Sequence, residues 1–168
     1  MIKFVADFYH LKQYEMQNYD TLAQQIASLV ADEHDETGVL ANVTAALHDS
    51  LGHHWIGFYL MRGDTLMLGP FQGPVACYRI GRGKGVCGHA AEMRQTVVVP
   101  DVEQFPGHIA CSSLSRSEIV IPLKDAQGEV RAVLDIDSTQ LDAFSETDRL
   151  GLERIADIVA KQIYYVER

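Results

Sequence analysis

Two apolar stretches joined by a short polar turn, Glu118–Leu123 (EIVIPL) and Val130–Asp137 (VRAVLDID), decide the fold class. Only the segment Lys124–Glu129 separates them, with a glycine at position 128. A connection this short is typical of an antiparallel hairpin, because parallel strands need a crossover of about a dozen residues or more. The hairpin therefore predicts an antiparallel sheet in this part of the chain.

The segments on either side of the hairpin place the chain in the α+β class. Aromatic and branched residues predict further strands upstream, over 53–61, 65–68, 75–80 and 96–99. Apolar residues at helical spacing predict helices over 20–33 and 36–50, a short one over 86–93 and a last one from 146. Gly52 is a stop signal, and Ser145 with Asp148 is an N-terminal capping signature. We expect one domain over 1–168, with N-terminal helices within about 12–50, the sheet and its loops over about 53–138, and a C-terminal helix over about 146–166.

Alternation along the strands gives each of them an aliphatic face and a second face with polar or aromatic members. Trp55 and Tyr59 share the second face of the first strand, and Glu118, Asp135 and Asp137 lie on that of the hairpin. The aliphatic faces are expected to pack on helices; on the last strand that face holds Val130, Ala132, Leu134 and Ile136. The second face is either solvated or lines a pocket for a small cationic group, and alternation alone leaves both open.

Composition excludes several classes of partner. The chain has 168 residues, 47% of them hydrophobic, and a formal net charge of −9, which repels phosphate backbones. Without an arginine-rich stripe, nucleic acid is not an expected partner. No apolar run approaches the ~18 residues of a membrane span, and the start MIKFVADFYH lacks the apolar run of a signal peptide. We therefore expect no membrane partner and a cytoplasmic location.

A glycine run over 81–88, GRGKGVCG, contains the dinucleotide-binding pattern G-x-G-x-x-G from Gly83 to Gly88. The context that this motif requires is missing, because no parallel strand follows it. A phosphate-binding loop is excluded as well, since Gly85 stands where a serine or threonine should follow Lys84. The remaining interpretation is a tight turn whose backbone N–H groups can bind a small carboxylate.

Three cysteines, Cys77, Cys87 and Cys111, lack the short Cys-x₂₋₄-Cys spacing of zinc sites, so no metal is expected. A cysteine taken alone is most simply a small buried hydrophobe. Cys111 differs because it lies in a long irregular segment, 100–117, where functional residues are common. His108 or Arg116 could favour its thiolate, although His108 is equally well a solvated turn residue.

Taken together, the chain resembles the free methionine-R-sulfoxide reductases of the GAF family. The stretches that carry the resemblance are WIGFY (55–59), GPFQG (69–73), Cys77, GKGVCG (83–88), PGHIAC (106–111), SEIV (117–120) and LDIDS (134–138). They cover nearly the whole chain, and PGHIAC together with three cysteines is specific, because ordinary GAF ligand sensors lack that combination. His54 departs from the family, in which an asparagine is common.

The resemblance implies a GAF domain, an antiparallel sheet with helices on one face and a ligand pocket on the other. It implies reduction of free L-methionine-(R)-S-oxide, with Cys111 at the catalytic position, Cys77 at the usual resolving position and Cys87 as the third, auxiliary thiol. Which of the last two resolves stays open. Five residues are expected at the substrate: Trp55, Tyr59, Glu118, Asp135 and Asp137.

The expected chemistry is attack of the Cys111 thiolate on the sulfoxide sulfur, followed by a sulfenic acid and a disulfide. Glu118 is the first choice for the acid that protonates the leaving oxygen, and Asp137 the second. Thioredoxin or another dithiol would restore the thiols without a bound cofactor, and the family resemblance suggests a homodimer. The alternatives are a GAF sensor that binds a small ligand without chemistry and a structural dimerisation domain.

Overall fold

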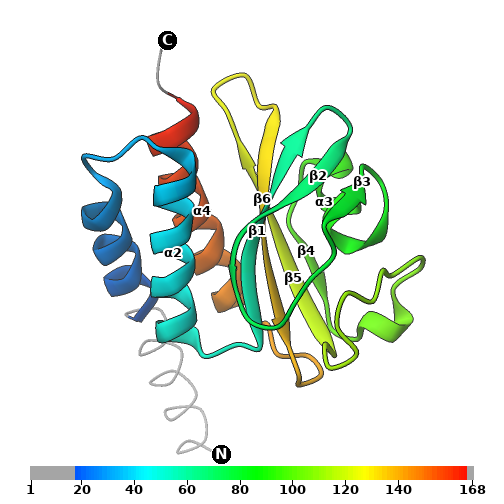
Figure 1. The fold of residues 1–168 in the computed structure, drawn as a ribbon. Helices are drawn as coiled ribbons and strands as arrows, with labels where there is room; N and C mark the ends of the chain where they lie inside the picture. The colour runs from blue at the N-terminus through cyan, green and yellow to red at the C-terminus, as the bar shows by residue number, and fades with distance from the viewer. Residues whose placement is uncertain (1–17, 166–168) are drawn as a thin grey trace, which may run out of the picture.

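The computed structural model describes residues 18–165 (Figure 1). A helix over residues 18–30 comes first, and the remaining elements follow in the order α2 (Glu36–Leu51), β1 (Trp55–Arg62), β2 (Thr65–Gln72), β3 (Arg79–Gly81), α3 (Gly85–Met93), β4 (Val97–Val99), η1 (Val102–Gln104), β5 (Ser117–Lys124), β6 (Val130–Ser138) and α4 (Glu146–Tyr164). The strands form one six-stranded sheet in the order β3-β2-β1-β6-β5-β4, and every neighbouring pair is antiparallel. The predicted hairpin, β5–β6, lies near the middle of this sheet, and the α+β class is confirmed.

The helix ends follow the signals in the sequence. Asp35 caps α2 by accepting from the Gly38 N–H, and Gly52 ends it in the left-handed conformation, φ 65°. Ser145 and Asp148 form the predicted capping box of α4. Residues 12–17 and 166, assigned to helices from the sequence, lie outside the described residues. No helix of 18–165 combines the length and apolar character that crossing a membrane requires.

The helices cover the two faces of the sheet unequally (Figure 1). The helix over 18–30, α2 and α4 lie along one face, where they bury the aliphatic sides of the strands, including Ile56, Ile119 and Leu134. The other face is covered by α3 and by the long connections, and its buried cluster includes Trp55 and Tyr59. The expected division between a helix-packed face and a second, chemically distinct face is therefore confirmed.

The second face is not solvated. Trp55 is 3% exposed, and Glu118 and Asp135 are each 6% exposed. Because α3 and the β2–β3 and β4–β5 connections lie over it, these polar groups are enclosed rather than in water. One residue expected on the aliphatic face, Val130, packs on the second face instead. An irregularity in the strand pairing at Leu123/Lys124 shifts the register at the end of the hairpin. The Val130 side chain therefore points to the second face.

Two strand predictions were wrong in extent. The third strand, expected over 75–80, is only Arg79–Gly81, and residues 75–78 form an exposed connection that pairs little with the sheet. The returning strand, expected over 65–68, continues to Gln72. Its extension passes through Pro70, which the sheet accepts there because β3 pairs only with Thr65–Met67 and leaves the rest of β2 as an edge.

Candidate active site

The strand register gathers the predicted polar residues on the three central strands. Trp55 on β1 is opposite Asp137 on β6, and Asp137 is opposite Glu118 on β5. Asp135, two residues back along β6, is opposite Gly57 on β1. Since residues two apart share a face, all four side chains project from the same side of the sheet.

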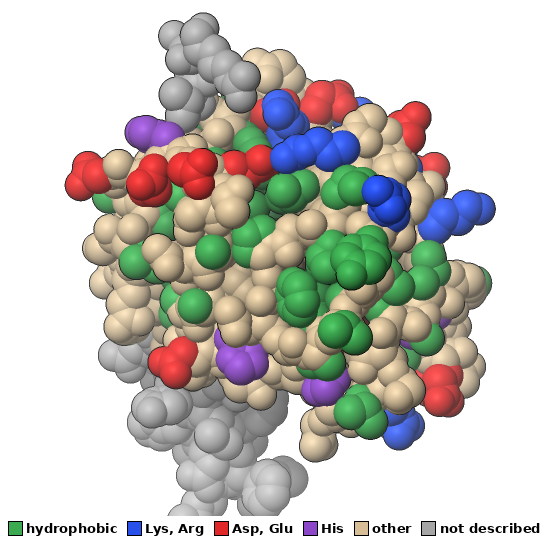
Figure 2. All heavy atoms as spheres, viewed as in Figure 1, with side chains coloured by type: hydrophobic (Ala, Val, Ile, Leu, Met, Phe, Trp, Pro, Cys, Tyr) green, Lys and Arg blue, Asp and Glu red, His purple; other side chains and the backbone are tan. Residues whose placement is uncertain are grey.

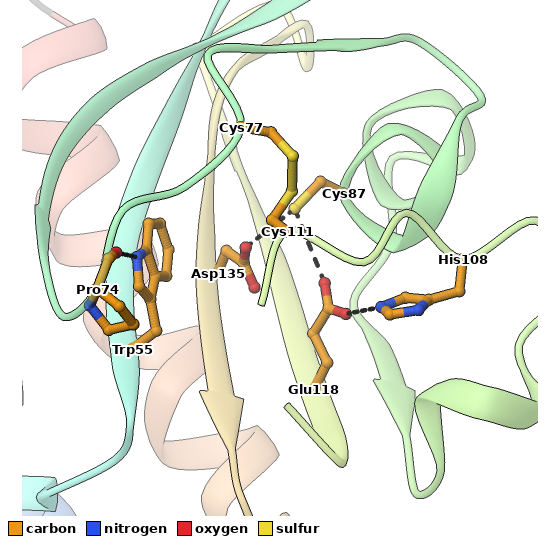
Figure 3. The surroundings of a disulfide bond; sticks show 8 residues. All are labelled: Trp55, Pro74, Cys77, Cys87, His108, Cys111, Glu118 and Asp135. Atoms are coloured by element: carbon orange, nitrogen blue, oxygen red, sulfur yellow. Dashed lines mark hydrogen bonds and ion pairs between the residues drawn. A yellow bond between two sulfur atoms is a disulfide. The ribbon is translucent and has the colours of Figure 1, made fainter. Parts of the chain in front are cut away.

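A disulfide joins Cys77 to Cys111 above this row of side chains (Figure 3). Cys77 lies in the β2–β3 connection and Cys111 in the connection between η1 and β5, with their Cα atoms 5.4 Å apart. Both cysteines are partly exposed. The structure therefore brings together two of the three predicted thiols, from connections that are 34 residues apart in the chain.

Cys87 lies beside the Cys111 end of the disulfide (Figure 3), in the first turn of α3, and is 3% exposed. Its Sγ donates to Asp135 Oδ2 at 3.3 Å and lies 3.9 Å from Glu118 Oε1. Burial, and then the neighbouring carboxylates, raise the pKa of the Cys87 thiol well above its usual range. The thiol form is favoured, which makes Cys87 a weaker nucleophile than an exposed cysteine.

The pKa values of all three carboxyl groups at the site are raised, and Glu118 and Asp135 favour their protonated forms. Burial raises the pKa of Glu118 and of Asp135 well above the ordinary range, and the charge of neighbouring carboxylates adds to the effect. Burial raises the pKa of Asp137 to about 6, although a hydrogen bond with Ser115 opposes the rise. Carboxyl groups that hold a proton near neutral pH can act as general acids.

His108 contacts Glu118, with 3.8 Å between His108 Nε2 and Glu118 Oε2. Burial lowers the pKa of His108, so the neutral ring is favoured over the imidazolium that would stabilise a thiolate. The Arg116 side chain is exposed, and its backbone N–H donates to Ser138 O. His108 thus lies beside Glu118 and favours its uncharged form.

Aromatic side chains line one side of the site, with Trp55 at their centre. Its Nε1 donates a hydrogen bond to Pro74 O at 3.1 Å. Its ring stacks on Phe71 and on Tyr59, at centroid distances of 5.3 and 5.9 Å. A Cβ at Gly57 would come within 2.5 Å of the Trp55 ring, so glycine is what lets the indole lie over the strand. Trp55 and Tyr59 together line a small cavity with Asp135 and Asp137.

The glycine run forms the tight turn that leads into α3. Gly83 N–H donates to Gly88 O, and a Cβ at Gly88 would lie only 2.3 Å from Gly81 O. Lys84, the N-cap of α3, makes no side-chain capping hydrogen bond to the described residues. The first-turn N–H groups of α3, which have no partner within the helix, therefore border the cavity that Gly85, Val86 and Cys87 line.

Two small cavities, of about 30 and 20 Å³, flank the disulfide. Both are lined by Cys111, Ser112, Asp135 and Asp137. A larger space of about 730 Å³ lies between α4 and the end of β5, where Lys124 and Arg149 line it. None of the predicted site residues lines this larger groove; they gather around the small cavities instead.

Three contributors to the site were not singled out from the sequence. Ser115 is buried and hydrogen-bonds Asp137, and Ser112 Oγ lies 3.3 Å from His54 Nε2. The serines stand in the loop that carries Cys111, which was the available signal. His54 was noted only as a departure from the family, and its contact links the start of β1 to that loop.

Cys87, Glu118 and Asp135 also offer ligand atoms that all lie within 4.8 Å of one another, close enough to hold a cation. They come from α3, β5 and β6, so no sequence spacing could have indicated this cluster. Among the described residues, Asp135 Oδ1 is buried without a hydrogen-bond partner, which leaves an acceptor free for a donor that enters the cavity. The expectation that no metal binds stays a prediction.

The fold and this arrangement of thiols and acids match a known family. The GAF domain model matches residues 35–163, and the chain belongs to the GAF domain family. A GAF domain-containing protein A of Dictyostelium discoideum is 50% identical over 144 residues, which is 85% of this chain and 90% of the relative.

Within the GAF family, the chain groups with free methionine-R-sulfoxide reductases. The reductase of that name from Escherichia coli is 45% identical over 82% of this chain and 83% of its own length. A solved structure of the Neisseria meningitidis free methionine-R-sulfoxide reductase in complex with its substrate superposes with a TM-score of 0.83, at 52% identity. That superposition covers 86% of this chain and 87% of the other.

Proposed function

We propose that this protein reduces free L-methionine-(R)-S-oxide to L-methionine, with Cys111 as the attacking thiol. The observation that carries the proposal is the Cys77–Cys111 disulfide, which lies directly over a cluster of buried carboxyl groups (Figure 3). A thiol that must attack and an acid that must give up a proton are thereby brought to one cavity. The similarity to reductases of this name supports the same assignment.

The first step is attack of the Cys111 thiolate on the sulfoxide sulfur. The sulfoxide oxygen can pass to the cysteine sulfur only once it is protonated, so an acid must lie beside it. Glu118 fits this role best, because it is buried among the carboxylates and its raised pKa keeps the proton available. Asp137 is the second candidate. The protonated oxygen is then transferred from the methionine sulfur to the Cys111 sulfur, the bond between the two sulfurs breaks, and methionine departs from a Cys111 sulfenic acid.

In the second step the Cys77 thiol attacks the Cys111 sulfenic acid, the Cys77–Cys111 bond forms and water leaves. Cys77 is favoured over Cys87 as the resolving thiol, because Cys87 is buried and holds its proton through the contact with Asp135. A dithiol such as thioredoxin then supplies two electrons and two protons and restores both cysteines. No bound cofactor is needed for this cycle.

Recognition of a free amino acid requires groups for both of its charged ends. The ammonium fits at Asp135, whose Oδ1 lacks a partner among the described residues, and next to Asp137. The carboxylate fits at the N-terminus of α3, where backbone N–H groups and the helix dipole favour an anion. Trp55 and Tyr59 suit the methylthio end, since aromatic rings make favourable contacts with sulfur.

The same proposal includes a cytoplasmic location, where thioredoxin keeps thiols reduced, and assembly as a homodimer. The GAF sensor is the second candidate function, favoured by the match to a relative that is described only as a GAF domain-containing protein. A sensor would bind its ligand at this face and turn nothing over.

The separating experiment is a dithiothreitol-driven assay on the isolated R and S diastereomers of free methionine sulfoxide and on the same sulfoxides within a peptide. We expect methionine from the free R form alone. The reductase assignment fails if the reduced protein binds free methionine sulfoxide but releases no methionine, and a sensor then becomes the better description.

A further inference from the structure

Large apolar side chains are exposed on both sides of the Cys77–Cys111 disulfide. Their exposed fractions are 86% for Val75, 77% for Tyr78, 38% for Ile109 and 58% for Leu114. Single exposed apolar residues are normal on a protein surface, but a group of them at one functional site marks an interaction surface. We call these four residues the disulfide rim. On the face drawn in Figure 2, hydrophobic side chains gather over the sheet and the segment that follows β2.

The rim is held in place by the backbone around it. Tyr78 O accepts a hydrogen bond from Leu68 N–H of β2, at 3.0 Å. Leu114 N–H donates to Ser112 Oγ, at 3.2 Å. The disulfide ties together the two segments that carry Tyr78 and Leu114. A surface arranged in advance in this way costs little ordering entropy when a partner binds.

The two sulfurs of the disulfide have different surroundings. Cys111 lines both small cavities and faces Cys87 and the carboxyl groups, whereas Cys77 lines neither of these cavities (Figure 3). An attacking thiolate approaches a disulfide sulfur from the side opposite the sulfur that leaves. Attack on Cys111 would therefore have to come from the enclosed cluster, and attack on Cys77 comes from outside.

We propose that a small dithiol protein of the thioredoxin class docks on the disulfide rim and attacks the sulfur of Cys77. This inference rests on the proposed function, in which an external dithiol regenerates the enzyme. The attacking thiolate forms a bond to Cys77 Sγ, the Cys77–Cys111 bond breaks, and its electron pair leaves on Cys111, which takes up a proton. The second thiol of the reductant then attacks the mixed disulfide, releases Cys77 and leaves the reductant oxidised.

The apolar rim favours a protein over a small thiol as the physiological reductant. A small thiol needs access to one sulfur only, and it gains nothing from Tyr78 or Leu114. A protein that covers the rim removes these side chains from water, and burial of exposed aromatic side chains is a common source of binding energy at interfaces. The released Cys111 thiol also lies directly over the substrate cavity, ready for the next cycle.

The first test traps the mixed disulfide. The oxidised protein is mixed with a thioredoxin whose second active-site cysteine is replaced by serine, quenched in acid and alkylated, and the adduct is mapped by mass spectrometry. We expect thioredoxin on Cys77 and an alkylated Cys111. An adduct that maps to Cys111 overturns the proposed direction of attack.

The second test separates docking from chemistry. Tyr78→Ser and Leu114→Ser should each lower kcat/KM for thioredoxin at least about fivefold, the effect of losing a substantial interface contact. Turnover with dithiothreitol should stay at the wild-type rate. Leu150→Ser removes a similarly exposed leucine from α4, across the sheet, and should change neither rate. Equal thioredoxin kinetics in all three variants overturns the docking surface.

Failure of this inference is distinguishable from failure of the proposed function. A wild-type protein that turns over with dithiothreitol but not with thioredoxin contradicts the partner class and leaves the reductase assignment intact. A wild-type protein that is inactive with both reductants contradicts the reductase assignment itself, and the docking proposal falls with it.

Discussion

Cys87 and Cys111 carry the same side chain in different surroundings, and the surroundings decide their chemistry. Cys87 is buried against Asp135 and Glu118, which favours the protonated thiol. Cys111 is partly exposed and bonded to Cys77. Sequence spacing alone left the resolving thiol open between Cys77 and Cys87, because the decisive quantity is burial, which depends on how α3 packs on the sheet.

Replacing single carboxyl groups tests their separate roles. Glu118→Gln should lower kcat by about 10²–10⁴-fold, because a group that protonates the leaving oxygen acts in the transition state. Asp135→Asn should mainly raise KM, because an ammonium contact made equally in ground and transition states is uniform binding. Steady-state kinetics of the R sulfoxide, with melting temperatures as a control for folding, measure both effects. Wild-type kinetics in both variants would show that this cluster does not bind the substrate.

The pKa of Asp137, raised to about 6, predicts a dependence of stability on pH. A carboxyl whose folded-state pKa is raised contributes stability below its unfolded pKa near 4, and loses it as pH rises through about 6. Ionising the buried Asp137 carboxyl therefore costs stability at pH 7.5, and Asp137→Asn removes that cost. The free energy of unfolding of the variant at pH 7.5 should exceed that of the wild type by on the order of 3 kcal/mol, less the weakened bond to Ser115. Denaturant unfolding at pH 4 and 7.5 gives the comparison. An advantage that is as large at pH 4 as at pH 7.5 would contradict the raised pKa.

The elements show where sequence reasoning succeeds and where it stops. Local signals, such as the Ser145–Asp148 capping box and the β5–β6 hairpin, predicted helix ends and strand pairing because their causes lie within a few residues. The segment 75–78 was misjudged because Val75 and Tyr78 have strand-like side chains but are exposed in a connection. This segment is joined to the loop of Cys111 by the disulfide, a contact that no local pattern records.

The residues of the site, too, could be predicted only where a local pattern in the sequence placed them. Alternation placed Trp55, Glu118 and Asp135 on one face, and the register confirmed it. Whether that face was wet could not be decided, because α3 and the loops that enclose it come from other parts of the chain. The roles of these residues in catalysis stay predictions.

The turn that leads into α3 offers a prediction at the scale of the element. A Cβ at Gly88 would collide with Gly81 O, so Gly88→Ala must displace the start of α3 and the N–H groups proposed to bind the substrate carboxylate. We expect lower stability together with a KM raised several-fold. Ser145→Ala, which removes the α4 cap, should cost about 1 kcal/mol and leave KM unchanged. An unchanged KM in Gly88→Ala would separate α3 from the substrate site.

At the scale of the whole molecule, the site lies between two layers. One is the sheet, which carries the carboxyl groups, and the other is α3 with the connections that the disulfide joins. In this oxidised form the cavities beside Cys111 measure about 30 and 20 Å³, room for only one or two waters each. Reduction of the disulfide frees the two connections from each other and is expected to open the space in which the substrate binds.

Ligand binding should therefore depend on the redox state. Free methionine, the product, should raise the melting temperature of the reduced protein and leave that of the oxidised protein unchanged, because a ligand stabilises only the form that binds it. Thermal unfolding at increasing methionine concentrations measures this, with Cys77→Ser as a form that cannot close. Equal shifts in both redox states would show that the disulfide does not restrict the site.

The most direct measurement of the central claim is a single turnover followed by mass spectrometry. Fully reduced protein is mixed with one equivalent of free L-methionine-(R)-S-oxide without any other reductant, and thiols and methionine are counted. We predict one methionine per chain and a Cys77–Cys111 disulfide in the wild type, a sulfenic acid on Cys111 in Cys77→Ser, and no methionine from Cys111→Ser, whose hydroxyl is not an activated nucleophile. Methionine release from Cys111→Ser at the wild-type rate would contradict the account.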